Sequence, residues 1–596
     1  MIWQSLSNAC VEAVTQLYGQ QINTDLIKIQ KTNQQFRAEA DLTLMVFPLV
    51  RYSKQSPEQT ATEIGAYLKD QVDYVQNFSV VKGFLNLRIA KSFWISFLKN
   101  NFTDQDFALQ TPKLNCPPVI VEYSSPNTNK PLHLGHIRNN LLGDSISRIL
   151  KSTGRNVIQV NLVNDRGIHI CKSMLAWQKW GRGETPESSG LKGDKLVGKY
   201  YVMFDKHYKE QIEELCEQGV EEEYAAKQAP LIVEAQTMLE QWESGNAEVK
   251  NLWNRMNKWV YSGFDVSYRN LGIAFDRTYY ESQTYLLGRD VVQDGLQKSV
   301  FYKNEDGSVW INLTDEGLDE KLLLRANGTS VYMTQDLGTA TTRFNEFHPE
   351  KMIYVVGNEQ NYHFEVLKKI LKKLQYNWAD DIRHFSYGMV ELPEGKMKSR
   401  EGTVVDADDL IAEVIETARQ TTMELGKLES FDTAEAQNLF RIIGLGGLKY
   451  FILKVDPLKN MMFNPKESID FTGNTGPFIQ YTYARIQSLL RKSGKDIMHI
   501  EISDAIDIHD EERELLFLCT DFKRILCLAA DELSPAHIAN YVFELAKQYN
   551  QFYQRISVLK EENELLLAFR LALSYFTAGV IKNSMNLLGI EVPHKM

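Results

Sequence analysis

The stretch Val119-Ile-Val-Glu-Tyr-Ser-Ser-Pro-Asn-Thr-Asn-Lys-Pro-Leu-His-Leu-Gly-His136 sets the fold class of this 596-residue chain. It opens with a β-branched run, residues 119–123, of the kind found in buried parallel strands. A helix is expected to begin at Leu134 or Gly135 and to run through Ile149, because apolar residues recur there at helical spacing. Residues 157–162 have the pattern of a second strand. Strand, loop, helix and strand in this order predict a doubly wound, Rossmann-type parallel sheet.

The rest of the chain predicts a multidomain α/β protein with four regions. We expect a small mixed α/β N-terminal domain at 1–112, the parallel-sheet domain at 113–405, a helical linker region at 406–472 and an all-α C-terminal domain at 473–596. The acidic, polar stretch at about 171–330 predicts a helical or mixed insertion within the sheet domain. Shorter elements are expected inside these limits: strands at 40–44, 84–89, 330–333, 352–356 and 385–389, with a basic helix at 366–374.

Composition narrows the cellular setting and the class of protein. The six cysteines form no Cys-x-x-Cys pair, which speaks against a structural zinc site and a disulfide framework and favours a reducing cytoplasm. The N-terminus lacks the pattern of a secretory signal, and no apolar run approaches the roughly 20 residues that cross a bilayer. A net charge of −11 gives no overall basic footprint for nucleic acid, although a local basic surface can still bind RNA.

Two histidines, His133 and His136, lie where the loop enters the predicted helix. Free backbone amides and the positive end of a helix form an anion site, and imidazole can donate hydrogen bonds to phosphate as negative charge builds up. Gly135 leaves room for a nucleotide beside the backbone, and Lys130 adds a positive charge to the same loop. Two alternatives stay open: a helix cap with a surface histidine, and a metal site, for which no further ligands stand at suitable spacing.

A second basic cluster, Gly395-Lys-Met-Lys-Ser-Arg-Glu-Gly402, follows the predicted strands. Three cations within five residues, closed by a glycine, suit a loop that clamps a polyphosphate. Taken alone, the cluster is better interpreted as a solvated charged turn. Together with the histidine segment across the sheet, it favours the clamp.

These two segments resemble the paired His-Ile-Gly-His and Lys-Met-Ser-Lys-Ser signatures of the class I aminoacyl-tRNA synthetases. The longer string Ser-Ser-Pro-Asn-x-x-Lys-Pro-x-His-x-Gly-His, at 124–136, is similar to that of the arginyl-tRNA synthetases. Further segments of the chain carry the same likeness: 83–87, 473–485 and 587–596. The sequence departs from the general signature at Ser399, which stands where the second lysine is usual, and Lys130, Lys398 or Arg400 could supply the missing charge.

The resemblance implies an enzyme that activates arginine with ATP, bound as its Mg²⁺ complex, and transfers it to tRNA(Arg). It implies a cytoplasmic monomer in which the N-terminal domain contacts tRNA and the C-terminal domain reads the anticodon. The residues that it assigns fall into four groups. The catalytic residues are Lys130, His133, His136, Lys396 and Lys398; the ATP-binding residues are Pro131, Leu134, Gly135, Asn139, Gly357, His363, Val390, Lys396 and Ser399; the arginine-binding residues are Glu122, Ser124, Asn127, Tyr332, Asp336 and Gln360; the tRNA-binding residues are Tyr481, Tyr483, Arg485, Tyr549, Tyr553 and Met596.

Other interpretations remain at this stage. A related nucleotidyltransferase could make adenylates without tRNA, but it would not need the long helical C-terminal region. A regulatory paralogue without catalysis is disfavoured because His133, His136 and Asp336 are all present. The segment Asn164-Asp-Arg-Gly167 is equally well a nucleotide-binding loop or a plain turn.

Overall fold

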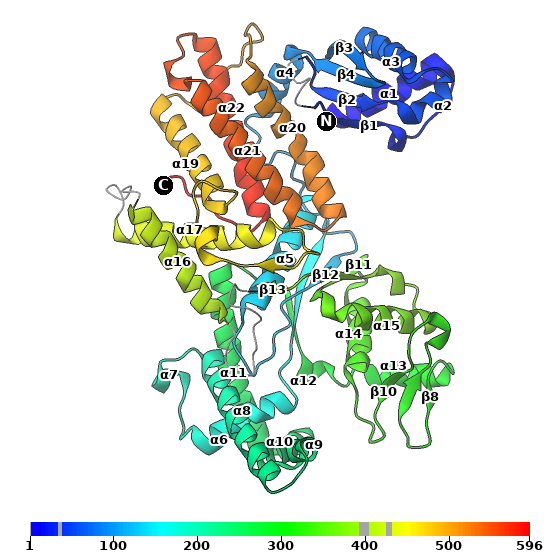
Figure 1. Cartoon of the computed structure of the whole chain (residues 1–596), viewed down its shortest axis with the longest axis vertical. Helices are drawn as coiled ribbons and strands as arrows, with labels where there is room; N and C mark the ends of the chain where they lie inside the picture. Colours follow the sequence, from blue (N-terminus) through cyan, green and yellow to red (C-terminus); the bar gives the residue numbers. More distant parts are fainter. Residues whose placement is uncertain (1, 34–38, 392–404, 425–431) are drawn as a thin grey trace.

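The computed structural model describes residues 2–33, 39–391, 405–424 and 432–596, and its parts are arranged along one long axis (Figure 1). The N-terminal part is a four-stranded antiparallel sheet in the order β1-β2-β4-β3, so the strands predicted at 40–44 and 84–89 are confirmed. Its elements are α1 (Ile2–Tyr18), β1 (Lys28–Lys31), β2 (Leu42–Met45), α2 (Val50–Ser53), α3 (Pro57–Gln71), β3 (Val75–Val81), β4 (Phe84–Ile89) and α4 (Lys91–Asn101).

The central sheet contains five strands in the order β12-β11-β5-β6-β7, and every neighbouring pair is parallel. These strands and the helices between them are β5 (Val119–Glu122), α5 (Leu134–Ser152), β6 (Val157–Val163), β7 (Arg277–Tyr280), α14 (Tyr332–Phe347), β11 (Lys351–Gly357), α15 (Asn361–Lys373) and β12 (Ile382–Tyr387). After β5 the chain adds β6 and then β7 on one side. It later adds β11 and then β12 on the other side of β5. Ligands of such sheets bind where the strand order reverses, here at the carboxyl ends of β5 and β11.

The two faces of this sheet bury different helices, as expected for parallel strands covered on both sides. Val121 and Val355 belong to the large core that contains the apolar face of α5. Ile120 and Tyr354 point the other way, into a smaller core with α14 and α15. Alternation of side chains along each strand therefore produces two cores. The Rossmann-type prediction is confirmed.

Two local predictions in the sheet domain were wrong. Residues 330–333 are not a strand: apart from an isolated bridge between Ser330 and Leu324, the segment leads into α14, which begins at Tyr332. A short apolar run does not distinguish a strand from the first turn of a buried helix. The region 171–330 is also not wholly an insertion, because β7 returns to the central sheet and pairs with β6.

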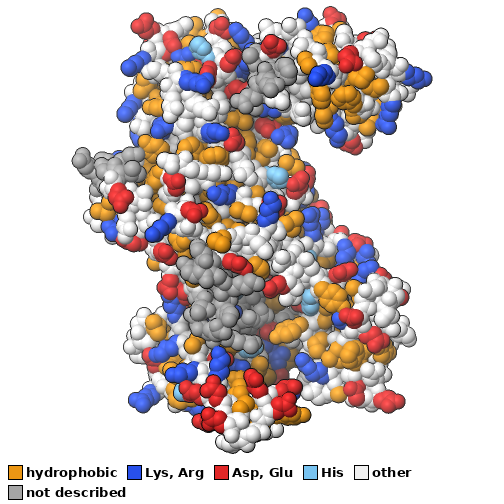
Figure 2. Space-filling model, viewed as in Figure 1, with side chains coloured by type: hydrophobic (Ala, Val, Ile, Leu, Met, Phe, Trp, Pro, Cys, Tyr) orange, Lys and Arg blue, Asp and Glu red, His pale blue; other side chains and the backbone are white. Residues whose placement is uncertain are grey.

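The residues between β6 and β7 are mainly helical, and those after β7 form a small antiparallel sheet in the order β10-β9-β8. The elements are α6 (Ile168–Trp180), α7 (Pro186–Ser189), α8 (Gly193–Glu217), α9 (Glu222–Gln228), α10 (Pro230–Glu243) and α11 (Ala247–Leu271), then α12 (Glu281–Thr284), α13 (Gly288–Gln297), β8 (Tyr302–Lys303), β9 (Val309–Ile311) and β10 (Lys321–Leu324). Acidic side chains gather at the lower end of the molecule in Figure 2, where Figure 1 places α9 and α10.

The described chain after residue 404 is helical, as predicted, except for the short strand β14 (Met461–Met462), which pairs with β13 (Val390–Glu391). The helices are α16 (Ala407–Glu424), α17 (Thr433–Leu453), α18 (Pro465–Ser468), α19 (Gly476–Ser493), α20 (Asp510–Asp531), α21 (Pro535–Arg555) and α22 (Glu564–Leu587). Among the described helices α22 alone has the length and composition to span a membrane, but it packs against α19 and α21 in the protein core. The N-terminal part lies beside α20, joined to it by ion pairs that include Lys31–Glu514 at 2.7 Å (Figure 1).

Candidate active site

The two histidines form the start of α5. His133 is the residue that caps the helix, and its Nδ1 accepts a hydrogen bond from the Gly135 amide at 3.1 Å. The amide of His133 in turn donates to Nδ1 of His136 at 3.2 Å, so each ring satisfies one free amide of the helix start. A Cβ at Gly135 would lie only 3.0 Å from the His133 ring. The cap predicted as an alternative to an anion site is therefore present, and it fixes both rings.

These hydrogen bonds determine which nitrogen carries the proton. Burial, with the positive charge of Lys130, lowers the pKa of His133 to about 3. Burial and the neighbouring His133 lower the pKa of His136 well below its ordinary value. Both rings are therefore neutral at pH 7, and because Nδ1 accepts, the proton resides on Nε2. The pair is thus able to donate two N–H groups from fixed positions without any change of protonation.

The chain that follows the second basic cluster runs beside these histidines. The amide of Leu134 donates to the carbonyl of Val405 at 3.3 Å, and the amide of Ala407 donates to the carbonyl of Leu132 at 2.9 Å. Lys396, Lys398 and Ser399 lie outside the described residues. The described chain resumes at Val405, and Asp406 forms an isolated antiparallel bridge with His133.

Lys130 contributes to a pocket of about 200 Å³ next to the histidine segment. Pro131 and His133 line the same pocket, together with Lys195 and Lys199 of α8. Lys195 lies 2.6 Å from Asp409 and 3.3 Å from Asp406, so that its charge is balanced by α16 and the residue before it. The structure thus concentrates basic side chains beside the start of α5.

The turn after β5 has an uncommon backbone conformation. Ser124 and Ser125 have φ values of +78° and +44°, which non-glycine residues seldom adopt. The Ser124 amide donates to Oδ1 of Asn139 at 2.5 Å, and the Ser125 amide donates to Oδ1 of Asn161 at 3.1 Å. Asn139 also donates to the carbonyl of Val355 at 2.7 Å. Strain held by surrounding bonds is typical of functional sites, and sequence reasoning did not identify it.

Asn139 was expected to bind ATP, but the structure gives it another task. Its side chain is buried, and its amide group joins the turn after β5 to β11. These bonds give Asn139 a structural role beside the start of α5, and its contact with ATP stays a prediction. Ser124 is likewise buried, with Oγ 2.7 Å from the hydroxyl of Tyr268, whereas Asn127 is exposed at the mouth of the turn.

Glu122, expected to bind a guanidinium, already faces one within the chain. Arg343 of α14 forms an ion pair with it, and both side chains are almost completely buried. Burial raises the pKa of Glu122, and the charge of Arg343 opposes that rise. The Arg343 guanidinium also lies over the rings of Tyr279 and Tyr354, at 4.8 and 5.7 Å from their centres. Glu122 is therefore paired with a cation of the protein itself in this structure, and its contact with arginine stays a prediction.

Asp336 and Tyr332 lie on α14, four residues apart, so they occupy one face of its first turns. Nε2 of His363 lies 2.6 Å from Oδ2 of Asp336, a distance at which the carboxylate accepts a hydrogen bond from the Nε2–H tautomer. Tyr332 is 74% exposed and lines a cavity of about 840 Å³. The proximity of Asp336 also raises the pKa of Glu122, which places the two carboxylates within electrostatic reach.

Glu281 is a carboxylate that sequence reasoning missed. It follows β7 directly, at the carboxyl end of the sheet, and lines the same cavity as Tyr332 and Gln335. Burial raises its pKa to about 7, with Arg166 opposing and Asp165 adding to the rise. Its position at the end of a strand could have identified it. β7, however, lies within the region that was predicted to be an insertion.

The opposite side of the site belongs to β11 and β13. Gly357 ends β11, and Gln360 lies exposed just before α15. The carbonyls of Met389 and Glu391 accept hydrogen bonds from the amides of Met461 and Phe463, in and just after β14. Because successive residues of a strand direct their backbone groups to opposite edges, Val390 presents its amide and carbonyl away from β14. This arrangement suits backbone recognition of a planar base.

Comparison with known proteins connects this geometry to a family. Residues 101–465 match the family described as "tRNA synthetases class I (R), catalytic domain", and residues 479–596 match the "DALR anticodon binding domain". Arginine–tRNA ligases of Bacteroides fragilis and Porphyromonas gingivalis are 57% and 54% identical to this chain, with complete coverage of both partners. The chain belongs to the class I arginyl-tRNA synthetases.

Solved structures show the same fold at lower identity. The arginyl-tRNA synthetase of Thermus thermophilus aligns with a TM-score of 0.81 and 24% identity over all of both chains. That of Plasmodium falciparum gives a TM-score of 0.78 at 20% identity, covering 100% of this chain and 99% of its own. Both structures share the overall fold of this chain.

The tyrosines expected to bind RNA in this synthetase separate into two groups. Tyr483 and Tyr549 are 3% and 0% exposed, so their rings are packed in the protein core and not presented on the surface. Tyr553 is 38% exposed, and Arg485 lies between it and Tyr481, at 5.3 and 4.8 Å from the two ring centres. Met596, at the end of the chain, is partly buried against the core.

Asp165 of the 164–167 loop is a structural centre in the synthetase fold. Its carboxylate accepts hydrogen bonds from the amide and hydroxyl of Ser282 at 2.8 and 2.7 Å and from the hydroxyl of Tyr261 at 2.8 Å. Its carbonyl accepts from Trp253 at 2.6 Å. These contacts join α11 to the start of α12, and the structural interpretation of the loop accounts for them. Among the described residues, no cluster of three metal-ligating side chains occurs.

Proposed function

We propose that this chain is an arginine–tRNA ligase that works in two steps. A carboxylate oxygen of arginine attacks the α-phosphorus of ATP, a P–O bond to the leaving group breaks, and pyrophosphate departs from arginyl-adenylate. A hydroxyl of the terminal adenosine of tRNA(Arg) then attacks the arginyl carbonyl and AMP departs. The observation that carries this proposal is the neutral histidine pair, His133 and His136, fixed at the start of α5 beside the chain at Val405.

The histidines act on the first step by donating hydrogen bonds from Nε2 to phosphate oxygens. Donors whose positions are fixed before the reaction stabilise charge that develops in the transition state. Lys130 supplies a positive charge on the same loop, and Lys396 and Lys398 supply further cations from the second basic cluster. ATP enters as its Mg²⁺ complex, with Pro131, Leu134, Gly135 and Gly357 beside its phosphates and sugar, Val390 beside its base, and Ser399 at the second signature.

Arginine is recognised by carboxylates at the end of the sheet. A guanidinium requires carboxylates as partners, and burying it without them is prohibitive. Since Glu122 is paired with Arg343, we assign the substrate guanidinium to Asp336. Tyr332, one turn earlier on α14, and Glu281 line a common cavity. Glu122 contributes through its negative charge, which lies within electrostatic reach of Asp336. The exposed Asn127 and Gln360 are placed to hold the α-amino group.

We assign the tRNA contacts to the N-terminal and C-terminal domains. The N-terminal domain, 1–112, contacts the tRNA body, and the helical domain, 473–596, reads the anticodon with Tyr481, Arg485 and Tyr553. The regions 113–405 and 406–472 are the catalytic domain and its helical linker. We also propose that the enzyme is a cytoplasmic monomer, which sedimentation at micromolar concentration would check.

The test is ATP–pyrophosphate exchange with each amino acid, with and without total tRNA. Exchange that requires arginine, and that rises sharply when tRNA is added, is the expected result. Exchange with a different amino acid would contradict the assignment of arginine. Exchange with arginine but no transfer to tRNA would favour the second candidate, an adenylate-forming enzyme without an RNA substrate.

A further inference from the structure

Arg138, in the second turn of α5, is a buried cation that the proposed steps of the reaction do not use. It is 1% exposed, and among the described residues no carboxylate lies close enough to form an ion pair with it. Burial lowers the pKa of its guanidinium to about 10, with Tyr387 opposing the change. A buried charge without an opposite charge is costly, so other contacts have to stabilise it.

Three backbone carbonyls supply these contacts. Nη1 of Arg138 donates to the carbonyl of Met389 at 3.2 Å, and Nη2 donates to the carbonyls of Pro457 and Lys459 at 3.1 and 2.8 Å. Met389 directly precedes β13, and the other two residues precede β14. The planar fork of donors in a guanidinium reaches several acceptors at once, so one side chain connects both strands to α5.

The sheet of β13 and β14 has two residues in each strand, too few to be stable without support from its surroundings. Local bonds hold the two segments together: the Gly388 amide donates to the carbonyl of Pro457 at 2.9 Å, and the Met389 amide donates to Oδ1 of Asn460 at 2.8 Å. A Cβ at Gly388 would lie only 2.5 Å from the carbonyl carbon of Lys459. The pair therefore moves as one unit, and Arg138 sets where that unit lies.

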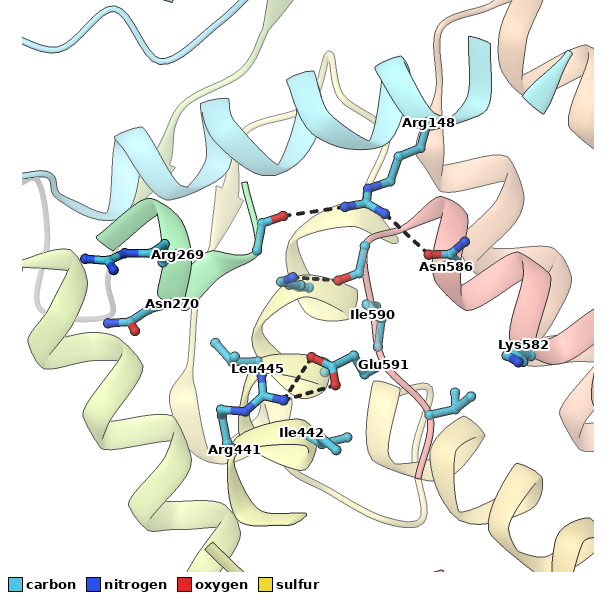
Figure 3. A pocket seen from close by; sticks show the side chains of 15 residues that line it. Arg148, Arg269, Asn270, Arg441, Ile442, Leu445, Lys582, Asn586, Ile590 and Glu591 are labelled. Atoms are coloured by element: carbon cyan, nitrogen blue, oxygen red, sulfur yellow. Dashed lines mark hydrogen bonds and ion pairs between the residues drawn. The ribbon is translucent and has the colours of Figure 1, made fainter. Parts of the chain in front are cut away.

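The helix that carries Arg138 is itself fixed along its length. His133 caps its first turn, and Asn139 bonds the turn after β5 and the end of β11. At its far end, α5 forms a wall of the cavity in Figure 3, where Arg148 donates to Asn586 at 3.3 Å and to the carbonyl of Gly272 at 3.5 Å. α5 is thus a firm reference against which Arg138 can position β13.

We propose that Arg138 is a positioning residue that holds β13 at the distance from the histidines at which one ATP molecule contacts both. The proposal rests on the ligase function proposed above. Val390 directs its amide and carbonyl away from β14 toward the base, while His133 and His136 donate to phosphate. A ligand that has to meet two sets of groups at once binds well only if their separation is correct. Arg138 acts through the backbone beside Val390 and does not touch ATP.

An amide and a carbonyl on one residue can distinguish adenine from hypoxanthine. Adenine presents an acceptor at N1 and an amino donor at C6, whereas hypoxanthine presents an N1–H donor and a carbonyl oxygen. The backbone groups of Val390 complement the first pattern and oppose the second, and buried polar groups left unpaired reject the wrong ligand. This selection requires a strand in a fixed position, so a displaced β13 should lose it.

The test is calorimetric binding of ATP, inosine triphosphate and pyrophosphate to the full-length enzyme, without arginine or tRNA. Arg138→Met keeps the length of the side chain and removes its donors, and Arg138→Lys keeps the charge but not the planar fork. The matched control is Arg513→Met, which removes another buried arginine, on α20, where it pairs with Asp41 of the N-terminal domain. Thermal unfolding of each variant fixes the temperature range in which the folded proteins are compared.

Arg138→Met should raise the Kd of ATP roughly tenfold, the loss of about one well-placed hydrogen bond, and change the Kd of inosine triphosphate and of pyrophosphate about twofold or less. The preference for ATP over inosine triphosphate should therefore fall. Arg138→Lys should give an intermediate preference, and it carries the test by itself if Arg138→Met does not fold. The control should behave as the wild type.

Three results would overturn the proposal. One is an unchanged preference for ATP in both Arg138 variants. Another is equal weakening of all three ligands, which would mean a general collapse of the site. The third is a wild-type enzyme that does not distinguish ATP from inosine triphosphate.

These measurements are independent of the amino acid substrate. A wild type that shows the expected binding but no exchange with arginine would contradict the proposed function and leave the role of Arg138 intact. Normal exchange with arginine by Arg138→Met, at an unchanged KM for ATP, would contradict the role of Arg138 and leave the proposed function intact.

Discussion

Polar groups at the carboxyl-end edge of the central sheet and polar groups in the C-terminal half of the molecule differ in how firmly the protein holds them. At the edge of the central sheet, the groups are held by backbone or by buried partners: His133 caps a helix, and Glu122 is paired with Arg343. In the C-terminal half, cations such as Lys582 extend from helix surfaces toward solvent. Fixed neutral donors suit a charge that exists only briefly, whereas long exposed cations suit a charge that is already present in a ligand.

This difference predicts where substitutions act. Changes at the sheet edge should lower the rate of adenylate formation far more than the affinity for ligands. Changes on the helical surfaces should lower affinity and leave the rate of the chemical step intact.

The largest effect is expected for His136→Ala. Loss of one preorganised donor to a developing charge lowers rates by about 10²- to 10³-fold. The measurement is kcat for ATP–pyrophosphate exchange with arginine and tRNA, with His537→Ala, on the C-terminal α21, as the control. A variant whose KM for ATP rises while kcat stays normal would break the comparison, because the ring would then act in binding.

A somewhat smaller loss is expected for Asp336→Asn. The substitution keeps the shape but removes the charge opposite the substrate guanidinium, so kcat/KM for arginine should fall on the order of 10²-fold. Steady-state aminoacylation at several arginine concentrations measures it. Glu346→Gln, at the far end of the same helix, is the matched control, and a normal kcat/KM in the Asp336 variant would remove Asp336 from the arginine site.

A further prediction concerns the aromatic residues of the C-terminal half. Tyr553→Ala should raise the KM for tRNA about tenfold, since one stacked base contributes about 1–3 kcal/mol, and kcat should stay within a factor of two or so. Tyr549→Phe removes only the hydroxyl bonded to Ser574 inside the core and should leave the KM for tRNA unchanged. Equal effects of the two variants would show that this surface does not contact RNA.

The smallest effect is a dependence of stability on pH. The pKa of His133 is about 3 in the folded protein and near 6.5 when unfolded, so the unfolded state binds a proton that the folded state does not as pH falls below 6.5. The free energy of unfolding should therefore fall with decreasing pH, by about 1 kcal/mol at pH 5.5 for this residue.

His133→Asn tests this contribution, because asparagine also caps helices and has no titration in this range. Urea unfolding at pH 7.5 and 5.5 should show a smaller loss of stability in the variant than in the wild type. Equal losses would mean that the folded protein protonates His133 readily, and that the histidine is not the neutral donor the sheet edge requires.

The central unit could be predicted from sequence because its signals are local. Residues 119–163 contain a β-branched run, a helix with apolar periodicity and a second strand, each within one short window. β7 was missed for the opposite reason. Its sequence, Arg277-Thr-Tyr-Tyr280, is a short edge strand without an apolar run, and only its partner β6 shows that it belongs to the sheet.

The site residues follow the same rule. The histidine pair was found because its spacing and its helix are local features. The pairing of Glu122 with Arg343 depends on two segments far apart in sequence, and no pattern near either residue announces it. Tyr483 and Tyr481 are two residues apart on one helix, so they face different sides, and residue type could not tell which of them is buried.

The capping of α5 by the histidines has a consequence for how the site can be observed. The amides of His133 and Gly135 are bonded to imidazole nitrogens, so their exchange with deuterium reports whether the rings are in position. A loosened ring leaves an amide open to solvent before any substrate is added. Assembly of the site is therefore visible in the empty enzyme as the protection of two backbone hydrogens.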